Sequence, residues 1–353
     1  MTEPRALTYP RLQTRLTRQF GLETPLVLAP MALASGGALA AACANAGVLG
    51  LVGGGYGDLD WTQKQYTLAC RQTLTGSARA RLGCGFITWK LDENASALDW
   101  VLDQPADDNP RAIMLSFGNP KPYAARIAAA GATLICQVQR MEQVPQALEA
   151  GARIIVAQGG EAGGHGMNSL NSRATLTFVP ELADWLAAHA PDTLLLAAGG
   201  IADGRTLAAA LVLGADGALV GSRLWATKES LASQGAKDQA LATNGDGTAR
   251  SSIFDILRRK NWPEPYDFRA IRNALHHRLE SSAQNLLADP AAARAEYDKG
   301  VEAGDFSRAH TTVGEAVGLI TDLDAAEAVI RRMSIDASAV FEPKGTLMQT
   351  RSA

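Results

Sequence analysis

A regular alternation of short apolar runs with Ala-rich helical stretches constrains the fold of this chain more than any other feature. The runs are apolar throughout, as expected for parallel strands that are covered on both faces. Eight such runs cover 26–30, 48–54, 82–87, 112–118, 133–138, 153–159, 194–200 and 217–222. Helical stretches lie between them, for example at 37–47, 121–131, 141–151 and 203–214, and several end in glycine, a common helix stop signal.

This alternation predicts an α/β fold, a (β/α)8 TIM barrel, with an open doubly wound eight-stranded sheet as the alternative. The strand count and the two late glycine turns favour the barrel. After Ser222 the sequence becomes polar and helical without strand signals, and an amphipathic helical pattern returns at 312–333. We therefore expect a barrel over 1–225 and a mainly helical accessory region over 226–310. A C-terminal helix that returns to the barrel, followed by a tail, is expected over 311–353.

Composition and charge narrow the class of protein. The 353 residues carry a formal net charge of -3, and the sequence contains no block of like charge. We therefore do not expect a nucleic-acid partner. The four cysteines, Cys43, Cys70, Cys84 and Cys136, lack CxxC spacing and are expected to be buried free thiols. No apolar run reaches the roughly 20 residues that span a bilayer, and residues 1–20 lack the apolar core of a secretory signal. We expect a cytoplasmic protein with no membrane partner.

The glycine turns after the last two strands suggest an anion site. Gly199 and Gly200 follow the seventh strand, and Gly221 and Ser222 follow the eighth, where barrels of this type often bind phosphate. The alternative is that these glycines only make tight turns. Because no GxGxxG follows the first strand, a mononucleotide cofactor or a phosphosugar fits better than a dinucleotide. Flavin mononucleotide (FMN) is attractive, since strand ends such as 29–31 and 83–85 offer a backbone cradle with few side chains.

The stretch VAQGGEAGGHG at 156–166 places His165 among glycines just after the sixth strand. A histidine at the barrel mouth can take a proton from a substrate carbon or hold an anion near neutral pH. The alternative is a loop histidine that faces solvent. The other histidines, His189, His276, His277 and His310, lie in helical or linker stretches and are expected to face solvent. The sequence contains no HExxH or other metal-ligand spacing, so a metal site is not expected, and the GxSxG motif of a serine nucleophile is also absent.

The chain resembles the nitronate monooxygenase family, formerly called 2-nitropropane dioxygenases, in four segments that keep the family's order and spacing. These are APM at 29–31, AQGGEAGGHG at 157–166, AAGGIADGR at 197–205 and LVGSR at 219–223. The resemblance extends to SFG at 116–118 and, more loosely, to VGEAVGLI at 313–320. It implies an FMN-dependent (β/α)8 barrel.

The resemblance also implies roles for individual residues. His165 falls on the catalytic histidine of the family, which deprotonates nitroalkanes or holds the nitronate. Pro30 and Met31 would lie against the flavin, with Ala29 contributing backbone. Gln158, Gly163 and Gly164 would contact the cofactor, and Gln137 falls near the flavin. Gly199, Gly200, Gly221 and Ser222 would hold the FMN phosphate.

One turn departs from the family pattern. Many members carry an Asn after the third strand, whereas this chain reads GCGFITW at 83–89, so that Trp89 could line the substrate side. The resemblance implies FMN-dependent oxidation of alkyl nitronates by O2 to a carbonyl compound and nitrite. A reductase of quinones or enoyl-acyl-carrier-protein substrates on the same scaffold is the alternative, and a non-redox barrel that binds a phosphorylated metabolite is a third. The expected partners are a small-molecule substrate and O2, and a homodimer is compatible with these expectations.

Overall fold

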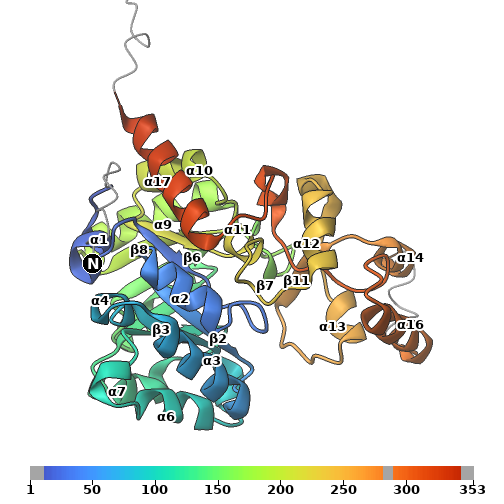
Figure 1. The fold of residues 1–353 in the computed structure, drawn as a ribbon, viewed down its shortest axis with the longest axis horizontal. Helices are drawn as coiled ribbons and strands as arrows, with labels where there is room; N and C mark the ends of the chain where they lie inside the picture. Colours follow the sequence, from blue (N-terminus) through green and yellow to red (C-terminus); the bar gives the residue numbers. More distant parts are fainter. Residues whose placement is uncertain (1–11, 281–288, 343–353) are drawn as a thin grey trace, which may run out of the picture.

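The computed structural model describes residues 12–280 and 289–342 and contains a barrel of eight parallel strands (Figure 1). All eight predicted runs form these strands, because each run is apolar on both faces and becomes buried. The strands are β1 (Leu26–Leu28), β2 (Gly50–Gly55), β3 (Leu82–Ile87), β4 (Ala112–Ser116), β5 (Thr133–Val138), β6 (Ile154–Gln158), β8 (Leu194–Ala198) and β9 (Gly217–Val220).

The strand order β1-β9-β8-β6-β5-β4-β3-β2 leaves β1 and β2 at the two ends of the sheet. These ends meet, because Leu28 N donates to the Leu49 carbonyl over 2.9 Å and Leu49 N donates to the Leu26 carbonyl over 3.4 Å. The barrel prediction is therefore confirmed, and the open-sheet alternative is wrong.

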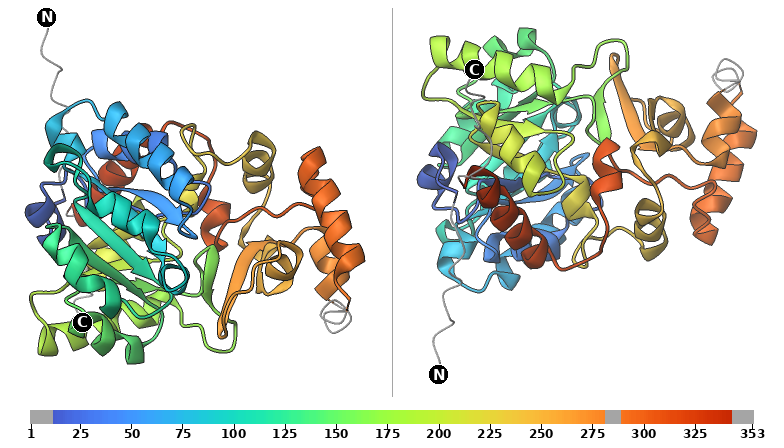
Figure 2. Two further views of the ribbon diagram at one scale, coloured as in Figure 1. Left: turned by 90° about the horizontal axis from the view of Figure 1, so that it is seen from below. Right: turned by 90° about the horizontal axis from the view of Figure 1, so that it is seen from above.

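Helices surround the barrel (Figures 1 and 2). Their apolar faces pack on the outward-facing side chains of the strands. Capping residues start several of them; Asp203, for example, accepts from Thr206 N at the start of α10. The helices of the barrel are α1 (Arg15–Phe20), α2 (Gly37–Asn45), α3 (Leu59–Gln72), α4 (Gly76–Arg79), α5 (Thr88–Leu91), α6 (Ser96–Leu102), α7 (Lys121–Ala129), α8 (Val144–Glu149), α9 (Thr175–His189), α10 (Gly204–Val212) and α11 (Ser222–Trp225). Short 3-10 turns add η1 (Ala106–Asp108) and η2 (Met141–Gln143).

The accessory region extends from one side of the barrel (Figures 1 and 2) and is mainly helical, as predicted. Its helices are α12 (Gln234–Leu241), α13 (Ile253–Leu257), α14 (Ala274–Glu280) and α16 (Ala291–Ala303), with the 3-10 turn η3 (Gly245–Gly247). It also contains two strands that the sequence did not predict, β10 (Thr248–Ser251) and β11 (Tyr266–Ile271). With β7 (Gly164–Met167) from the barrel they form an antiparallel sheet in the order β10-β11-β7. The accessory region therefore joins the loop that carries His165.

The helix expected at 312–333 is wrong in its first half. Residues 312–325 contain only the 3-10 turn η4 (Glu315–Leu319), and helix α17 (Ala326–Phe341) follows them. The backbone of this first half bonds to the barrel instead: Gly314 N donates to Ser222 Oγ, and Glu315 N donates to the Glu161 carbonyl. Helix α17 packs on α10 and α2. The part of the expected tail at 343–353 lies outside the described residues, as do residues 1–11 of the expected barrel.

Two further expectations concern the cysteines and the membrane. All four cysteines are buried free thiols, as predicted. Among the described residues, no helix combines the length and the apolarity needed to cross a membrane.

Candidate active site

The mouth of the barrel differs from its interior in the kind of side chain that points inward. Deeper in the barrel, alternate strand residues such as Met114, Ile135 and Val156 form an apolar cluster. Because side chains alternate along a strand, the residues two positions further on face the same way. They are Ser116, Gln137 and Gln158, which replace apolar groups by a hydroxyl and two amides. The polar layer lies at the carboxyl ends of the strands, where barrels of this type carry their sites.

The amide side chains in this layer bond to one another. Gln137 Nε2 and Gln139 Nε2 both donate to Gln158 Oε1, over 3.2 and 2.9 Å. Gln158 Nε2 in turn donates to the His165 carbonyl over 3.0 Å. Gln139 Oε1 is buried and keeps no hydrogen-bond partner. The network therefore fixes the backbone of His165 above the barrel and brings the predicted residues Gln137, Gln158 and His165 together.

The His165 side chain forms a buried pair with an acid from the accessory region. His165 lies on β7 opposite Phe268 of β11, and its Nε2 is 3.0 Å from both carboxylate oxygens of Asp255 on α13. The two side chains are only 9% and 6% exposed. No hydrogen bond reaches His165 Nδ1 within the described part of the chain. When Asp255 accepts the Nε2–H, the lone pair of the neutral ring is left on Nδ1.

Two aromatic rings lie against the imidazole. Trp262 stacks on it with ring centroids 3.4 Å apart, and Phe268 lies tilted at 4.7 Å. This burial lowers the pKa of His165 to about 4, although the neighbouring Asp255 acts in the opposite direction. The ring is therefore neutral at physiological pH and can accept a proton.

Two arginines of the accessory sheet hold the glycine-rich loop after β6. Arg250 donates to the carbonyls of Gly160, Ala162 and Gly164 over 3.3, 2.6 and 3.1 Å. Arg269 Nε adds a bond to the Gly160 carbonyl over 3.1 Å. Burial lowers the pKa of Arg250 to about 10, so this guanidinium remains charged at neutral pH. The hydrogen bonds from Arg250 and Arg269 thus hold the backbone of a loop that has few side chains of its own. Arg250 lies 90 residues after Gly160 in the sequence.

The same loop also packs on the last turns of the barrel. A Cβ at Gly163 would lie 2.5 Å from Gly314 N, so only glycine permits this close approach. Gly314 N in turn donates to Ser222 Oγ over 2.8 Å. This contact gives a structural reason for the sequence pattern around Gly314. It links the predicted residues Gly163 and Ser222 through a residue that was not predicted.

Of the predicted phosphate residues, Gly200 and Gly221 lie beside open space, whereas a Cβ at Gly199 would lie 3.1 Å from Ala162 N. Gly200 has φ +76°, and a Cβ there would meet only Glu161 Cβ, at 3.8 Å. In the described residues, the amide N–H groups of Gly200 and Ile201 have no hydrogen-bond acceptor. A Cβ at Gly221 would meet Met31 Sδ at 3.7 Å and nothing closer. Free amides beside uncrowded glycines are what an anion site requires.

The remaining predicted residues follow β1. Ala29 N donates to the Val220 carbonyl, and a Cβ added at Gly221 would lie 3.8 Å from the Ala29 side chain. Pro30 lies over Gly85, where a Cβ would come within 2.3 Å of its ring. The structure thus brings Ala29, Met31 and Gly221 together at one side of the mouth. Gly164, with φ +71°, lies next to His165 on β7.

Several residues of the site were not predicted, among them Asp255, Trp262 and Arg250. The turn-rich stretch NWPEPYDF around Trp262 is recognisable in the sequence only as a turn, and Asp255 lies in a short apolar helix. Of the other histidines, His189 and His277 are exposed as expected. The expectation is wrong for His276, which is 1% exposed and bonds to Ser251 Oγ, and for His310. His310 Nδ1 bonds to the Tyr297 hydroxyl inside an aromatic cluster, and burial lowers its pKa to about 3.

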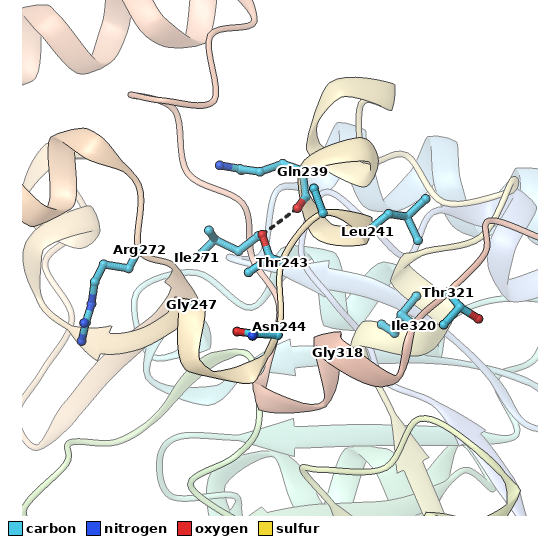
Figure 3. A pocket seen from close by; sticks show the side chains of 11 residues that line it. Gln239, Leu241, Thr243, Asn244, Gly247, Ile271, Arg272, Gly318, Ile320 and Thr321 are labelled. Carbon is cyan, nitrogen blue, oxygen red and sulfur yellow. Dashed lines mark hydrogen bonds between the residues drawn. The ribbon is translucent and has the colours of Figure 1, made fainter.

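A second hollow lies outside these residues. A groove of about 800 Å³ runs between α12, η3 and η4, and its walls include Gln239, Asn244 and Arg272 (Figure 3). In the part of the chain that the structure describes, no cluster of three or more His, Cys, Asp or Glu side chains could hold a metal ion.

Comparison with known sequences gives one family. The chain matches the family model described as nitronate monooxygenase over residues 91–334. The nitronate monooxygenase npaC of Metarhizium robertsii is 31% identical over 342 residues, which cover 90% of this chain and 92% of that protein. The nitronate monooxygenase of Neurospora crassa is 30% identical, and 88% of each chain is covered.

Solved structures share the architecture. FabK from Thermotoga maritima superposes with a TM-score of 0.76 at 23% identity, covering 93% of this chain and 97% of its own. The nitroalkane oxidase from Streptomyces ansochromogenes gives a TM-score of 0.72 at 23% identity, covering 92% and 98%. At this identity the likeness concerns the fold.

Proposed function

Because the chain belongs to the nitronate monooxygenase family, a family of oxidoreductases, we propose that it is an FMN-dependent enzyme that oxidises alkyl nitronates with O2. The products would be a carbonyl compound and nitrite. The observation that carries the proposal is the buried His165–Asp255 pair at the barrel mouth, with Nδ1 of the imidazole free of protein partners in the described residues. A neutral imidazole held in this way is suited to take the proton of a neutral nitroalkane.

The residues at the mouth fit a flavin mononucleotide. The free amides of Gly200 and Ile201 and the open space at Gly221 suit its phosphate. Gln137, Gln158 and the unpartnered Gln139 Oε1 offer the donors and acceptors that a flavin ring requires. Pro30 and Met31 supply apolar surface beside them. FMN, when bound, would accept electrons from the nitronate and pass them to O2.

The chain's own residues would position the substrate and handle its proton. His165 Nδ1 takes the proton from the carbon next to the nitro group, and Asp255 stabilises the imidazolium that results. Trp262 and Phe268 pack against the ring and shield it from water. A preformed nitronate needs no proton removal, so for such a substrate His165 serves to hold the anion.

Flavin absorbance and two turnover assays test the proposal. The purified protein should carry or take up FMN, and it should consume O2 with propyl nitronate. A colourless protein that FMN cannot reconstitute would contradict the proposal and favour the non-redox barrel. Rapid NADH oxidation with a quinone and no response to nitronate would favour the reductase. His165→Ala should lose activity on neutral nitropropane while retaining FMN; loss of FMN would instead assign a structural role to His165.

A further inference from the structure

The indole of Trp262 joins the accessory region to the loops of the barrel. It lies between α13 and β11, and its Nε1 donates to the Tyr56 hydroxyl over 3.0 Å. Four aromatic side chains surround it edge-on, and we call them the aromatic enclosure. Their ring centroids lie 5.0 to 6.3 Å from that of Trp262, and they are Tyr56, Trp89, Phe117 and Tyr266. Because Trp262 also stacks on His165, the enclosure adjoins the proposed catalytic ring.

Strained backbone supports this arrangement on two sides. Phe117 has φ +64° although it carries a large side chain, and this conformation turns its ring towards Trp262 and Tyr266. Arg259, at the start of the segment that carries Trp262, has φ +57°. Left-handed non-glycine residues persist where the surroundings enforce them, often at functional sites. The packing around Phe117 and Arg259 therefore enforces the backbone conformation that forms the aromatic enclosure.

A cavity of about 250 Å³ continues from the enclosure towards the polar layer of the barrel mouth. Phe117 and Tyr266 form one wall, Val138 and Ala147 line it, and Gln137 lies at its edge. Gln143 Nε2 donates to the Tyr266 hydroxyl over 3.4 Å and so holds that ring at the cavity. The cavity thus shares Phe117 and Tyr266 with the aromatic enclosure, and its walls combine apolar side chains such as Val138 with the amides of Asn119, Gln143 and Gln146.

Two lysines lie at the outer side of the aromatic enclosure. Lys260 Nζ lies 4.3 Å from the ring centroid of Tyr56, and Lys90 Nζ lies 4.7 Å from that of Trp89. Lys90 is paired with Glu93, whereas no carboxylate partner of Lys260 occurs in the described ranges. Trp89 Nε1 is buried and has no hydrogen-bond partner. The positive charge of Lys260 and the free N–H of Trp89 favour an anion with oxygen acceptors at this place. A second negative charge, at the other end of the substrate, would lose its hydration on entering the cavity.

We propose that the aromatic enclosure and the adjoining cavity select the substrate, and that it is a nitronate with an aryl substituent rather than a short linear alkyl group. The inference rests on the proposed function. An aryl ring can make edge-to-face contacts with Phe117 and Tyr266 and fill the hollow, whereas an ethyl group leaves it unfilled. We expect kcat/KM for the nitronate of phenylnitromethane to exceed that for ethyl nitronate at least tenfold, which is about 1.4 kcal/mol.

Variants locate the source of this preference. Trp89→Leu opens the enclosure and Ala147→Phe fills the cavity, so each should lower the aryl-to-ethyl ratio of kcat/KM at least fivefold, mainly through the KM of the aryl substrate. Trp185→Leu is the matched control, because Trp185 is a half-buried indole that stacks on exposed His189, away from the site. Its ratio should equal that of the unmodified protein.

Inhibition of the unmodified holoenzyme provides a measurement that does not depend on the folding of variants. Benzoate and propionate are planar anions with two oxygens, like a nitronate, and benzoate should inhibit at an at least tenfold lower concentration. Equal use of both nitronates, or equal inhibition by both carboxylates, would overturn the substrate class while leaving nitronate oxidation intact. Failure of the FMN-loaded protein to oxidise any nitronate would instead contradict the proposed function.

Discussion

Nε2 of His165 lies 3.0 Å from both oxygens of Asp255, and this pair joins the loop after β6 to helix α13 of the accessory region. Asp255 is 90 residues further along the chain and is buried. A buried carboxylate that accepts from Nε2 fixes the tautomer of the ring. The accessory region is thus part of the proposed chemistry and not merely an attachment to the barrel.

Asp255→Asn should impair proton removal selectively. The asparagine amide can donate to Nε2, which moves the ring proton to Nδ1 and removes the base. We expect kcat/KM for neutral nitropropane to fall by about 10²–10⁴-fold, the range for loss of a positioned base or its correct tautomer. Oxygen uptake with preformed propyl nitronate should change less than fivefold. Asp99→Asn, in an exposed pair with Arg126, is the control, and equal losses on both substrates would refute the positioning role of Asp255.

The pH dependence should show the buried environment of His165. Burial lowers the pKa of this residue to about 4, and the base is active only when neutral. Activity on a neutral nitroalkane should therefore be retained as pH falls through 6.5, the usual value for histidine, and be lost as pH falls through about 4. The log of kcat/KM against pH between 3.5 and 8 measures this. An acidic limb centred at 6.5 would contradict the burial argument.

The barrel could be predicted from the sequence because each strand is a single apolar run and several of the intervening helices end in glycine. The partner of His165 could not be predicted, since nothing local distinguishes Asp255 in IFDIL from an acid that faces solvent. Strands β10 and β11 were missed for a related reason. Strand β10 reads TARS and has no apolar run, and Asp267 and Arg269 interrupt the apolar pattern of β11, although Arg250 and Arg269 point at loop carbonyls rather than water. The partner of His165 and the two accessory strands therefore depend on tertiary contacts, which the local sequence pattern does not show.

Arg250→Met should release the loop that carries His165. The substitution removes this donor from the carbonyls of Ala162, Gly164 and Asp267, whereas the Gly160 carbonyl keeps its bond from Arg269, and each carbonyl that loses its partner costs about 1–3 kcal/mol. We expect the free energy of unfolding to fall by at least about 3 kcal/mol in urea titrations. Arg126→Met removes an exposed ion pair and should change it by less than about 1 kcal/mol. Similar effects of the two variants would argue against the loop-holding role of Arg250.

Gly200→Ala tests the proposed phosphate site, with a control for backbone strain in the same chain. Gly200 has φ +76°, and its free amide adjoins the open space that we assign to the phosphate. Gly151 follows α8 with φ +84°, and a Cβ added there would meet no atom within 4 Å. Both substitutions should therefore cost the folded state a similar amount, about 1–2 kcal/mol.

Only Gly200→Ala should affect the cofactor, because only this methyl group enters the space next to the free amides. We expect its Kd for FMN, measured by flavin fluorescence quenching, to rise at least tenfold, while Gly151→Ala binds FMN like the unmodified protein. Equal FMN affinity in the two variants would place the phosphate elsewhere. Weaker binding in both would mean that general destabilisation, rather than contact at Gly200, controls cofactor retention.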